Sequence, residues 1–151
     1  MQDINDLAPL IQRNVELKAR IIANDEHDQK GERALLNFGH TVAHGIERAV
    51  DYKIPHGEAV SLGIVAASEI SMRKSGLPQS DRDAIVDLLK KFQLPTKLPR
   101  DFPREKIFDA LKFDKKFERG QIRFVLTPKP GSAFLASDVT MDDIRDAVAK
   151  L

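Results

Sequence analysis

The sequence HGEAVSLGIVAASEI at residues 56–70 predicts the central element of the molecule. Its apolar residues cover most of a helical circumference instead of one stripe, which is typical of a buried helix. They are Val60, Leu62, Ile64, Val65, Ala66, Ala67 and Ile70. The stretch Ser75-Gly76-Leu77-Pro78 follows as a glycine–proline terminator. We therefore expect a buried helix from His56 to about Ser75, against which the other elements pack.

Two amphipathic helices are predicted before this central helix. The first has apolar residues at helical spacing over 7–22, with Asn5 or Asp6 available as the N-cap. Lys18 lies on the same stripe as these apolar residues, where a buried stem with the ammonium group in water is one explanation. A polar turn over 24–31 then leads to a second helix, expected from about Glu32 to Val50.

The part of the chain after Pro78 is expected to form two helices, a hairpin and a last helix. Ser80 can cap a helix that ends near Phe92, residues 94–103 are predicted to be a loop, and another helix starts at about Arg104 and runs into 114–116. The β-branched and aromatic segments 121–126 and 133–135 flank a turn at 130–131 and predict a small β-hairpin. Thr140 with Asp143 resembles a capping box for a helix to Leu151. The predicted fold class is mainly α with one small hairpin.

Length and composition limit the classes of protein to which the chain can belong. The 151 residues suit one helical domain spanning 1–151, and 42% apolar residues supply a core. With 24 basic and 23 acidic residues, the net charge of +1 does not favour nucleic-acid or membrane partners. The chain has no cysteine, no apolar run of membrane-spanning length and no signal sequence. We expect a soluble, cytoplasmic protein.

One side of the predicted second helix has an unusual composition. Its residues are Arg33, Asn37, His40, His44 and Glu47, spaced four, three, four and three apart. Solvated helix faces are more often built from lysine and glutamate. Gly39 and Gly45 each cost a helix about 1 kcal/mol relative to alanine. We interpret this side as lining a binding site.

The histidines on this side suggest a metal site. His40 and His44 are four residues apart, so both imidazoles can reach one ion, and His56 opens the next helix. Three histidines, or two with a carboxylate such as Glu47 or Glu58, would satisfy catalytic zinc. The alternative is that the histidines are surface residues or hydrogen-bonded parts of the core.

Cationic and amide side chains near the histidines suggest an anionic ligand. Arg33, Asn37 and Lys18 are suited to carboxylate or phosphate oxygens. The alternative for Arg33 is an ion pair with Asp25, Glu26 or Asp28. Lys115 and Lys116 would ordinarily be solvated charges at a helix end.

At these residues the chain closely resembles the C-terminal domain of 3-dehydroquinate synthase. The resemblance rests on Leu36-Asn37-Phe38-Gly39-His40-Thr41, then His44 and Glu47, then His56-Gly57-Glu58-Ala59-Val60. It extends back through Lys18-Ala19 and Asp25-Glu26 to Arg33, and forward to Asp114-Lys115-Lys116 and Phe124-Val125-Leu126. It covers most of the chain, and its histidine motifs are highly specific.

The resemblance implies a NAD- and zinc-dependent lyase of the shikimate pathway of aromatic amino acid biosynthesis. Such an enzyme cyclises 3-deoxy-D-arabino-heptulosonate 7-phosphate to 3-dehydroquinate, with loss of phosphate. NAD is held by an N-terminal α/β domain, and the helical domain holds zinc, or another divalent metal such as cobalt. The full-length enzyme is expected to be a homodimer. Family chemistry oxidises a ring hydroxyl with NAD, eliminates phosphate, returns the hydride and recloses the ring by an aldol step.

The resemblance also implies roles for individual residues. His40 and His56 match the two histidine ligands of the zinc, and His44 matches a catalytic histidine near the phosphate and ring. Lys18 and Arg33 match carboxylate-binding positions. Asn37 and one of Lys115 or Lys116 match contacts on the phosphate side. The position of Lys18 on an apolar stripe is then explained by a charge directed into an interdomain cleft.

Two family features have no match in this chain. The third zinc ligand is a glutamate from the N-terminal domain, and no glycine-rich nucleotide-binding loop follows a predicted strand. We therefore expect a chain that folds, binds zinc weakly, and neither binds NAD nor turns over substrate alone. The alternatives are a domain of a related sugar-phosphate cyclase or metal-dependent polyol dehydrogenase, or a non-catalytic helical binding domain that is indifferent to substitution of its histidines.

Overall fold

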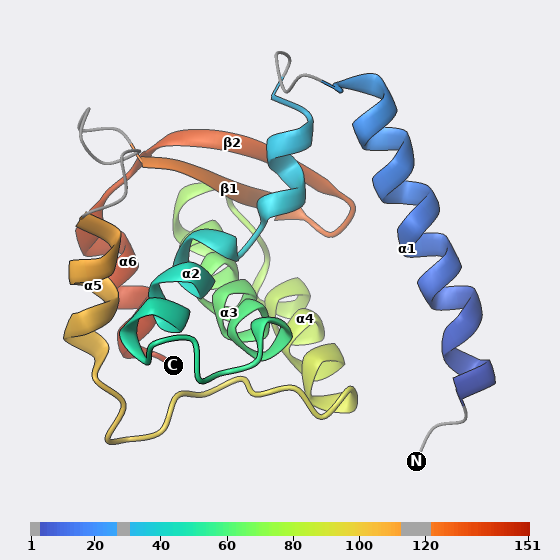
Figure 1. Ribbon diagram of the computed structural model, residues 1–151. Helices are drawn as coiled ribbons and strands as arrows, with labels where there is room; N and C mark the ends of the chain where they lie inside the picture. The colour runs from blue at the N-terminus through green and yellow to red at the C-terminus, as the bar shows by residue number, and fades with distance from the viewer. Residues whose placement is uncertain (1–3, 27–30, 113–121) are drawn as a thin grey trace. The chain divides into compact units, whose positions relative to one another are not determined.

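The computed structural model describes residues 4–26, 31–112 and 122–151. The chain divides into two compact units, Met1–Leu36 and Asn37–Leu151. Over the described residues there are six α-helices, one short 3₁₀ helix and one two-stranded sheet. Figure 1 labels the α-helices and the strands. The predicted class, mainly α with one hairpin, is confirmed.

The first unit contains helix α1 (Ile4–Asn24). Because α1 begins at Ile4, Asn5 and Asp6 lie inside the helix, and the prediction that either is its N-cap is wrong. The apolar residues Leu10, Ile11 and Val15 are 45%, 57% and 62% exposed. One helix and a single 3₁₀ turn are too few elements to enclose a core, so this stripe is not buried within its own unit.

The predicted second helix, Glu32 to Val50, is broken in the structure. A 3₁₀ helix, η1 (Arg33–Asn37), is followed by α2 (His40–Ala49), and Gly39 between them has a φ of 80°. A left-handed residue cannot continue a right-handed helix, so the expected single stripe from Arg33 to Glu47 does not exist. His40, His44 and Glu47 lie on α2, whereas Arg33 and Asn37 are the two ends of η1.

Helix α3 (His56–Lys74) is the central element of the second unit, as predicted. It contacts α2, α4 (Gln79–Lys91), strand β1 (Ile122–Lys129) and α6 (Met141–Ala149), while α5 (Arg104–Lys112) packs on α2 (Figure 1). Its buried residues include Leu62, Val65, Ala66 and Ile70. The N-terminus of α3 lies beside α2, because its first residue, His56, contacts Glu47.

Glycines allow α2 to approach its neighbours closely. A Cβ on Gly39 would lie 2.7 Å from the backbone nitrogen of Ile64, and a Cβ on Gly63 would collide with the carbonyl oxygen of Gly39. A Cβ on Gly45 would lie 2.9 Å from Cγ2 of Ile107 on α5. Gly45 therefore allows α2 to pack closely against α5.

The C-terminal elements that the structure describes follow the sequence prediction with one exception. The predicted end of the α5 helix at 114–116 lies outside the described residues. Strand β1 pairs antiparallel with β2 (Ser132–Val139), and residues 94–103 contain no helix or strand. Thr140 and Asp143 form a complete capping box at α6. Ser80 does not cap α4, because that helix begins one residue earlier, at Gln79, and Pro78 is its N-cap.

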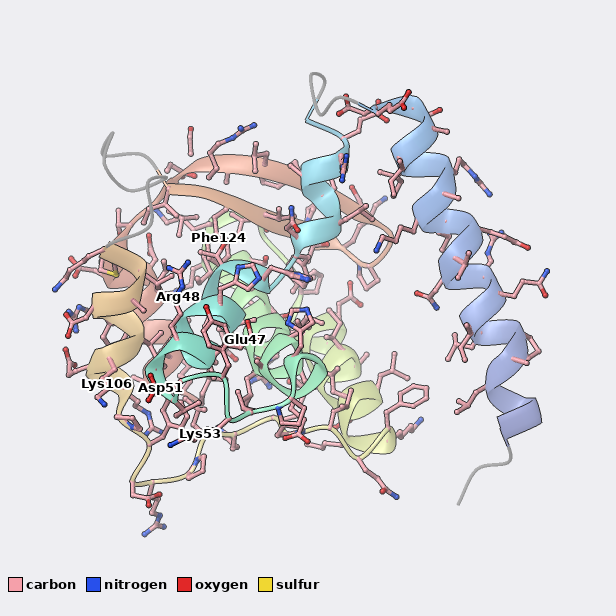
Figure 2. The ribbon with its side chains drawn as sticks, viewed as in Figure 1. Glu47, Arg48, Asp51, Lys53, Lys106 and Phe124 are labelled. Atoms are coloured by element: carbon pink, nitrogen blue, oxygen red, sulfur yellow. The ribbon has the colours of Figure 1, made fainter. Side chains whose placement is uncertain are left out.

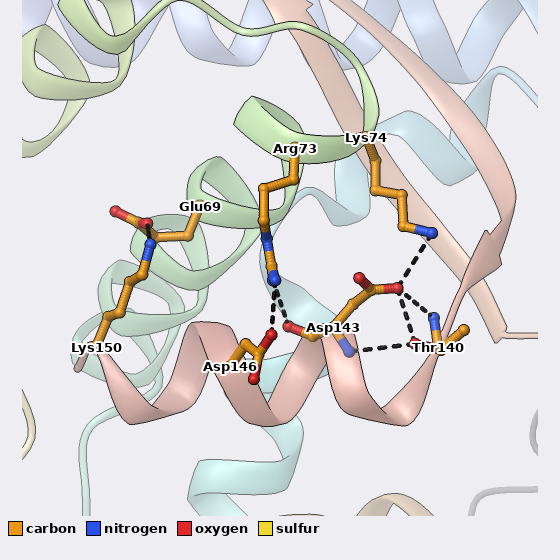
Figure 3. A network of polar contacts seen from close by, with 7 residues as sticks. All are labelled: Glu69, Arg73, Lys74, Thr140, Asp143, Asp146 and Lys150. Atoms are coloured by element: carbon orange, nitrogen blue, oxygen red, sulfur yellow. Dashed lines mark hydrogen bonds and ion pairs between the residues drawn. The ribbon is translucent and has the colours of Figure 1, made fainter.

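A polar network joins the end of α3 to α6 (Figure 3). Arg73 donates to the carboxylate of Asp146 at 2.8 Å, Lys74 lies 3.3 Å from Asp143, and Lys150 donates to Glu69 at 2.6 Å. These contacts link residues about seventy positions apart and hold α6 against α3. In residues 4–26, 31–112 and 122–151, no helix combines the length and apolar character needed to cross a membrane.

Candidate metal and substrate site

Three imidazoles meet where α2 and α3 begin. His40 is the first residue of α2, His44 lies one turn further along, and His56 is the first residue of α3. The ring centroids are 5.7 Å apart for His40 and His44, 5.5 Å for His40 and His56, and 6.3 Å for His44 and His56. The turn between α2 and α3 thus returns His56 to the side of His40 and His44.

The hydrogen bonds of His40 and His56 define which ring nitrogen faces away from the protein. Nδ1 of His40 lies 3.3 Å from the carbonyl oxygen of Phe38, and Nδ1 of His56 lies 2.8 Å from Oε1 of Glu47. Carbonyl and carboxylate oxygens accept hydrogen bonds, so each Nδ1 carries the proton and donates it. In the neutral form of each ring, Nε2 then keeps a lone pair, as a metal ligand requires.

Glu47 lies on the protein side of this cluster and His56 on the solvent side. The Glu47 side chain, on α2, is 8% exposed, whereas that of His56 is 59% exposed. Figure 2 labels Glu47 on this helix. The sequence indicated Glu47 as a possible metal ligand, but its carboxylate contacts Nδ1 of His56. Two features of the sequence indicate that Glu47 is a buried hydrogen-bond partner of a histidine: its helical spacing with His40 and His44, and the apolar residues Ile46 and Ala49 near it.

His44 lies in an environment that favours its neutral form. Partial burial lowers the pKa of its imidazole, the carboxylate of Glu47 raises it, and the neighbouring His40, His56 and Arg48 lower it, with a net lowering. The imidazole is therefore neutral near pH 7 and can accept a proton or a hydrogen bond.

The other predicted site residues lie on other elements or outside the described residues. Asn37 is exposed and ends η1. Lys18 is exposed on α1 and Arg33 is exposed on η1, both in the first unit. The Arg33 guanidinium donates to the carbonyl oxygen of Glu26 at 3.2 Å, and Asp25 accepts from the Arg33 backbone nitrogen at 3.4 Å. Lys115 and Lys116 lie outside the described residues.

The cluster suits a metal as a partial ligand set. Two imidazoles present free Nε2 atoms from adjacent helix starts, and a soft-to-borderline divalent ion such as zinc prefers nitrogen donors of this kind. Within the described part of the chain, no three histidine, aspartate or glutamate side chains are arranged to hold a metal by themselves. The donor chemistry therefore fits zinc or cobalt, provided that a further ligand comes from elsewhere.

Comparison with known proteins identifies relatives over nearly the whole chain. A family model described as 3-dehydroquinate synthase C-terminal matches residues 1–117. The chain is 40% identical over 141 residues to a 3-dehydroquinate synthase of Methylacidiphilum infernorum, which covers 93% of this chain and 39% of that protein. It is 41% identical over 145 residues to the Bordetella pertussis 3-dehydroquinate synthase, covering 95% and 40%. The chain thus spans about two fifths of the length of these relatives.

Solved structures share the fold at lower identity. A 2-deoxy-scyllo-inosose synthase complexed with carbaglucose-6-phosphate, NAD⁺ and Co²⁺ aligns with a TM-score of 0.83 and 23% identity, covering 99% of this chain and 42% of that chain. A 2-epi-5-epi-valiolone synthase from Streptomyces hygroscopicus subsp. jinggangensis, with NAD⁺ and Zn²⁺ bound, aligns with a TM-score of 0.76 and 22% identity, covering 94% and 39%.

Proposed function

Because the chain belongs to the 3-dehydroquinate synthase C-terminal family, we propose that it is the metal- and substrate-binding domain of a synthase that makes 3-dehydroquinate. The substrate would be 3-deoxy-D-arabino-heptulosonate 7-phosphate, and the enzyme would be a carbon–oxygen lyase of the shikimate pathway. The observation that carries the proposal is the convergence of His40, His44 and His56, with ring centroids 5.5 to 6.3 Å apart, in a chain of this family.

His40 and His56 are the residues proposed to hold the metal, through their Nε2 atoms. A bound zinc or cobalt ion supplies Lewis acidity at the substrate hydroxyl that loses hydride to NAD. His44 remains outside the ligand set and acts as the proton-transfer or hydrogen-bonding group near the ring and phosphate. The lowered pKa of its imidazole supports this role, since the neutral ring can take up a proton at neutral pH.

The substrate's anionic groups are assigned to residues with cationic or amide donors. Lys18 and Arg33 are proposed to bind the carboxylate, while Asn37 and one of Lys115 or Lys116 bind on the phosphate side. All five side chains donate hydrogen bonds and none carries a negative charge, which suits the binding of oxyanions. Lys18, Arg33 and Asn37 are exposed in the structure, which supports their availability to a ligand.

Other parts of the enzyme are proposed to come from protein outside this chain. The relatives are about two and a half times as long, which leaves room for an N-terminal domain that binds NAD and donates a third, carboxylate ligand. We propose that residues 1–151 form a single helical domain alongside it, in a cytoplasmic homodimer. The isolated chain is then inactive and binds no NAD.

A related sugar-phosphate cyclase is the second candidate function. It is favoured by the fold shared with the inosose and valiolone synthases, at 22–23% identity. The relatives at about 40% identity favour the dehydroquinate synthase reaction instead. A polyol dehydrogenase or a non-catalytic binding domain has no comparable support among these relatives.

Cobalt titration of the isolated chain tests the metal assignment. Calorimetry or visible absorption should detect weak, stoichiometric Co²⁺ binding that falls at least about tenfold in His40→Ala and in His56→Ala. His27→Ala is the matched control, because it removes the remaining histidine, which the proposal does not use. Equal affinities in all four proteins would rule out the metal site and favour the non-catalytic alternative.

A chimera tests the reaction. This chain would replace the C-terminal region of the Bordetella pertussis relative, and phosphate release from the seven-carbon keto-acid phosphate would be measured. We expect turnover in the chimera, a loss of about 100-fold or more in its His44→Ala variant, and none with the chain alone. Turnover by the isolated chain would contradict the need for a second domain, and full activity of His44→Ala would contradict the role of His44.

A further inference from the structure

A buried carboxylate behind the histidine cluster has no role in the assignments above. Glu47 is 6% exposed, yet it is held by an imidazole, whereas the other buried glutamate on these helices, Glu69, is held by Arg82 and Lys150. Burying a carboxylate costs several kcal/mol unless it is well paired. The buried carboxylate of Glu47 is therefore costly to keep for packing alone. The group that it contacts is Nδ1 of His56, 2.8 Å from its Oε1.

We propose that Glu47 is a positioning residue for His56, and this rests on the proposed metal-binding role of that histidine. The hydrogen bond spans from α2 to the first residue of α3, so it fixes the rotation of the His56 ring. It also holds the proton on Nδ1, which directs the Nε2 lone pair away from the protein. A carboxylate on the far ring nitrogen is the usual way in which proteins fix the orientation of a ligating histidine.

The geometry assigns Glu47 an indirect role and excludes it as a ligand together with His56. Nδ1 and Nε2 lie on different edges of the imidazole ring, so a carboxylate bound at Nδ1 points away from an ion at Nε2. His40 shows the weaker version of the same arrangement, with Nδ1 3.3 Å from the Phe38 carbonyl. The two ligands are thus oriented by different acceptors, a carboxylate for one and a backbone carbonyl for the other.

Two variants of Glu47 separate the effect of its hydrogen-bond acceptor from the effect of its negative charge. Glu47→Gln keeps an oxygen that can accept from Nδ1 but loses the charge, while Glu47→Leu removes both. Asp51→Asn is the matched control, because it removes one negative charge just beyond α2, at an exposed residue whose φ of 52° asparagine tolerates. Circular dichroism of each metal-free variant establishes that it is folded.

The first readout is the tautomer of His56 in the metal-free chain, measured by two-bond ¹H–¹⁵N correlation of the imidazole rings. The wild type and Asp51→Asn should show the proton on Nδ1. Glu47→Gln should largely retain this tautomer, and Glu47→Leu should show a mixture. A purely structural role for Glu47 would change the unfolding midpoint and leave the tautomer unchanged. A wild-type proton on Nε2 would overturn the proposal.

The second readout is Co²⁺ affinity. We expect a loss of about 10- to 100-fold in Glu47→Leu, a smaller loss in Glu47→Gln and none in Asp51→Asn. Affinity in Glu47→Leu within about twofold of wild type, while His40→Ala and His56→Ala weaken binding at least about tenfold, would overturn the role of Glu47 and leave the proposed function intact. If the histidine variants themselves bind like wild type, the proposed function fails, and the tautomer still decides whether Glu47 orients His56. Should Glu47→Leu not fold, Glu47→Gln gives both readouts alone, and unchanged affinity with an unchanged tautomer overturns the proposal.

Discussion

The backbone at Gly39 combines two demands that only glycine meets. Its φ of 80° is left-handed, and a Cβ there would lie 2.7 Å from the backbone nitrogen of Ile64. Relief would require α2 and α3 to move apart, because the obstacle is backbone and not a flexible side chain. The residue that precedes the first predicted ligand is thus held by the adjoining helix.

Substitution of this glycine should be strongly destabilising. We expect Gly39→Ala to lower the free energy of unfolding by about 2 to 4 kcal/mol, from left-handed strain and steric overlap together. Urea unfolding followed by circular dichroism measures this loss. Gly57→Ala is the control, since nothing lies within 4 Å of its Cβ position and alanine favours the helix. Similar stability of the two variants would contradict the close approach described for Gly39.

At the scale of one element, the capping box of α6 should contribute measurably to stability. The hydroxyl of Thr140 accepts from the Asp143 backbone nitrogen at 3.2 Å, and Asp143 accepts from the Thr140 backbone nitrogen at 2.9 Å. We expect Thr140→Ala to cost about 1 kcal/mol in unfolding free energy, and Thr140→Ser to cost much less because it keeps the hydroxyl. Equal losses in the two variants would show that the methyl group, and not the cap, is responsible.

The ion pairs between α3 and α6 predict a dependence of stability on pH. Burial would raise the pKa of Glu69, but the hydrogen bond from Lys150 and the charge of Arg82 outweigh it and lower the pKa. For Asp143, burial is likewise outweighed by hydrogen bonds from Thr140 and by Lys74. A carboxyl with a lowered folded pKa adds stability above its unfolded pKa, near 4, and this is lost as the pH falls through the folded value.

We therefore expect the free energy of unfolding to decrease as the pH is lowered from about 6 to about 3. Urea unfolding across this range should give a shallower decrease for Glu69→Gln than for wild type. Asp87→Asn, which changes a largely exposed carboxylate on α4, should keep the wild-type decrease. The same slope in Glu69→Gln as in wild type would remove Glu69 as a source of the pH dependence.

Element by element, the fold was predicted well from the sequence where the hydrophobic periodicity, a turn or a two-residue capping motif gave a clear signal. The buried helix α3, the hairpin and the capping box of α6 were all recognised, because each depends on local pattern. The break at Gly39 was missed, since helix spacing continues through it and only the approach of Ile64 and Gly63 forces the left-handed turn. The histidine cluster was predicted from the spacing of its residues. The contact of the Glu47 carboxylate with His56 was not predicted, because it depends on how the connection 50–55 places the start of α3 beside α2.

At the scale of the whole molecule, the second unit contains the core. The residues of the buried apolar cluster lie between Val42 and Leu151, and the backbone nitrogen of Leu98 donates to the carbonyl of Leu151 at 2.8 Å. We expect residues 37–151 expressed alone to fold with an unfolding free energy within about 1 kcal/mol of the whole chain, because the buried apolar cluster lies entirely within them. Circular dichroism and urea unfolding test this. A truncated protein with no cooperative transition would show that the first unit is needed for the core.

The histidine cluster also has a consequence for the order in which the molecule forms. His40 and His56 are sixteen residues apart, and a connection of that order closes in well under a microsecond. Strand β1 meets α3 only through pairs such as Thr127 and Ser71, 56 positions apart, and such distant contacts form more slowly. We therefore expect the three imidazoles to come together before β1 joins α3. The nitrogen donors of the cluster would then be available while the chain beyond α3 is still being synthesised.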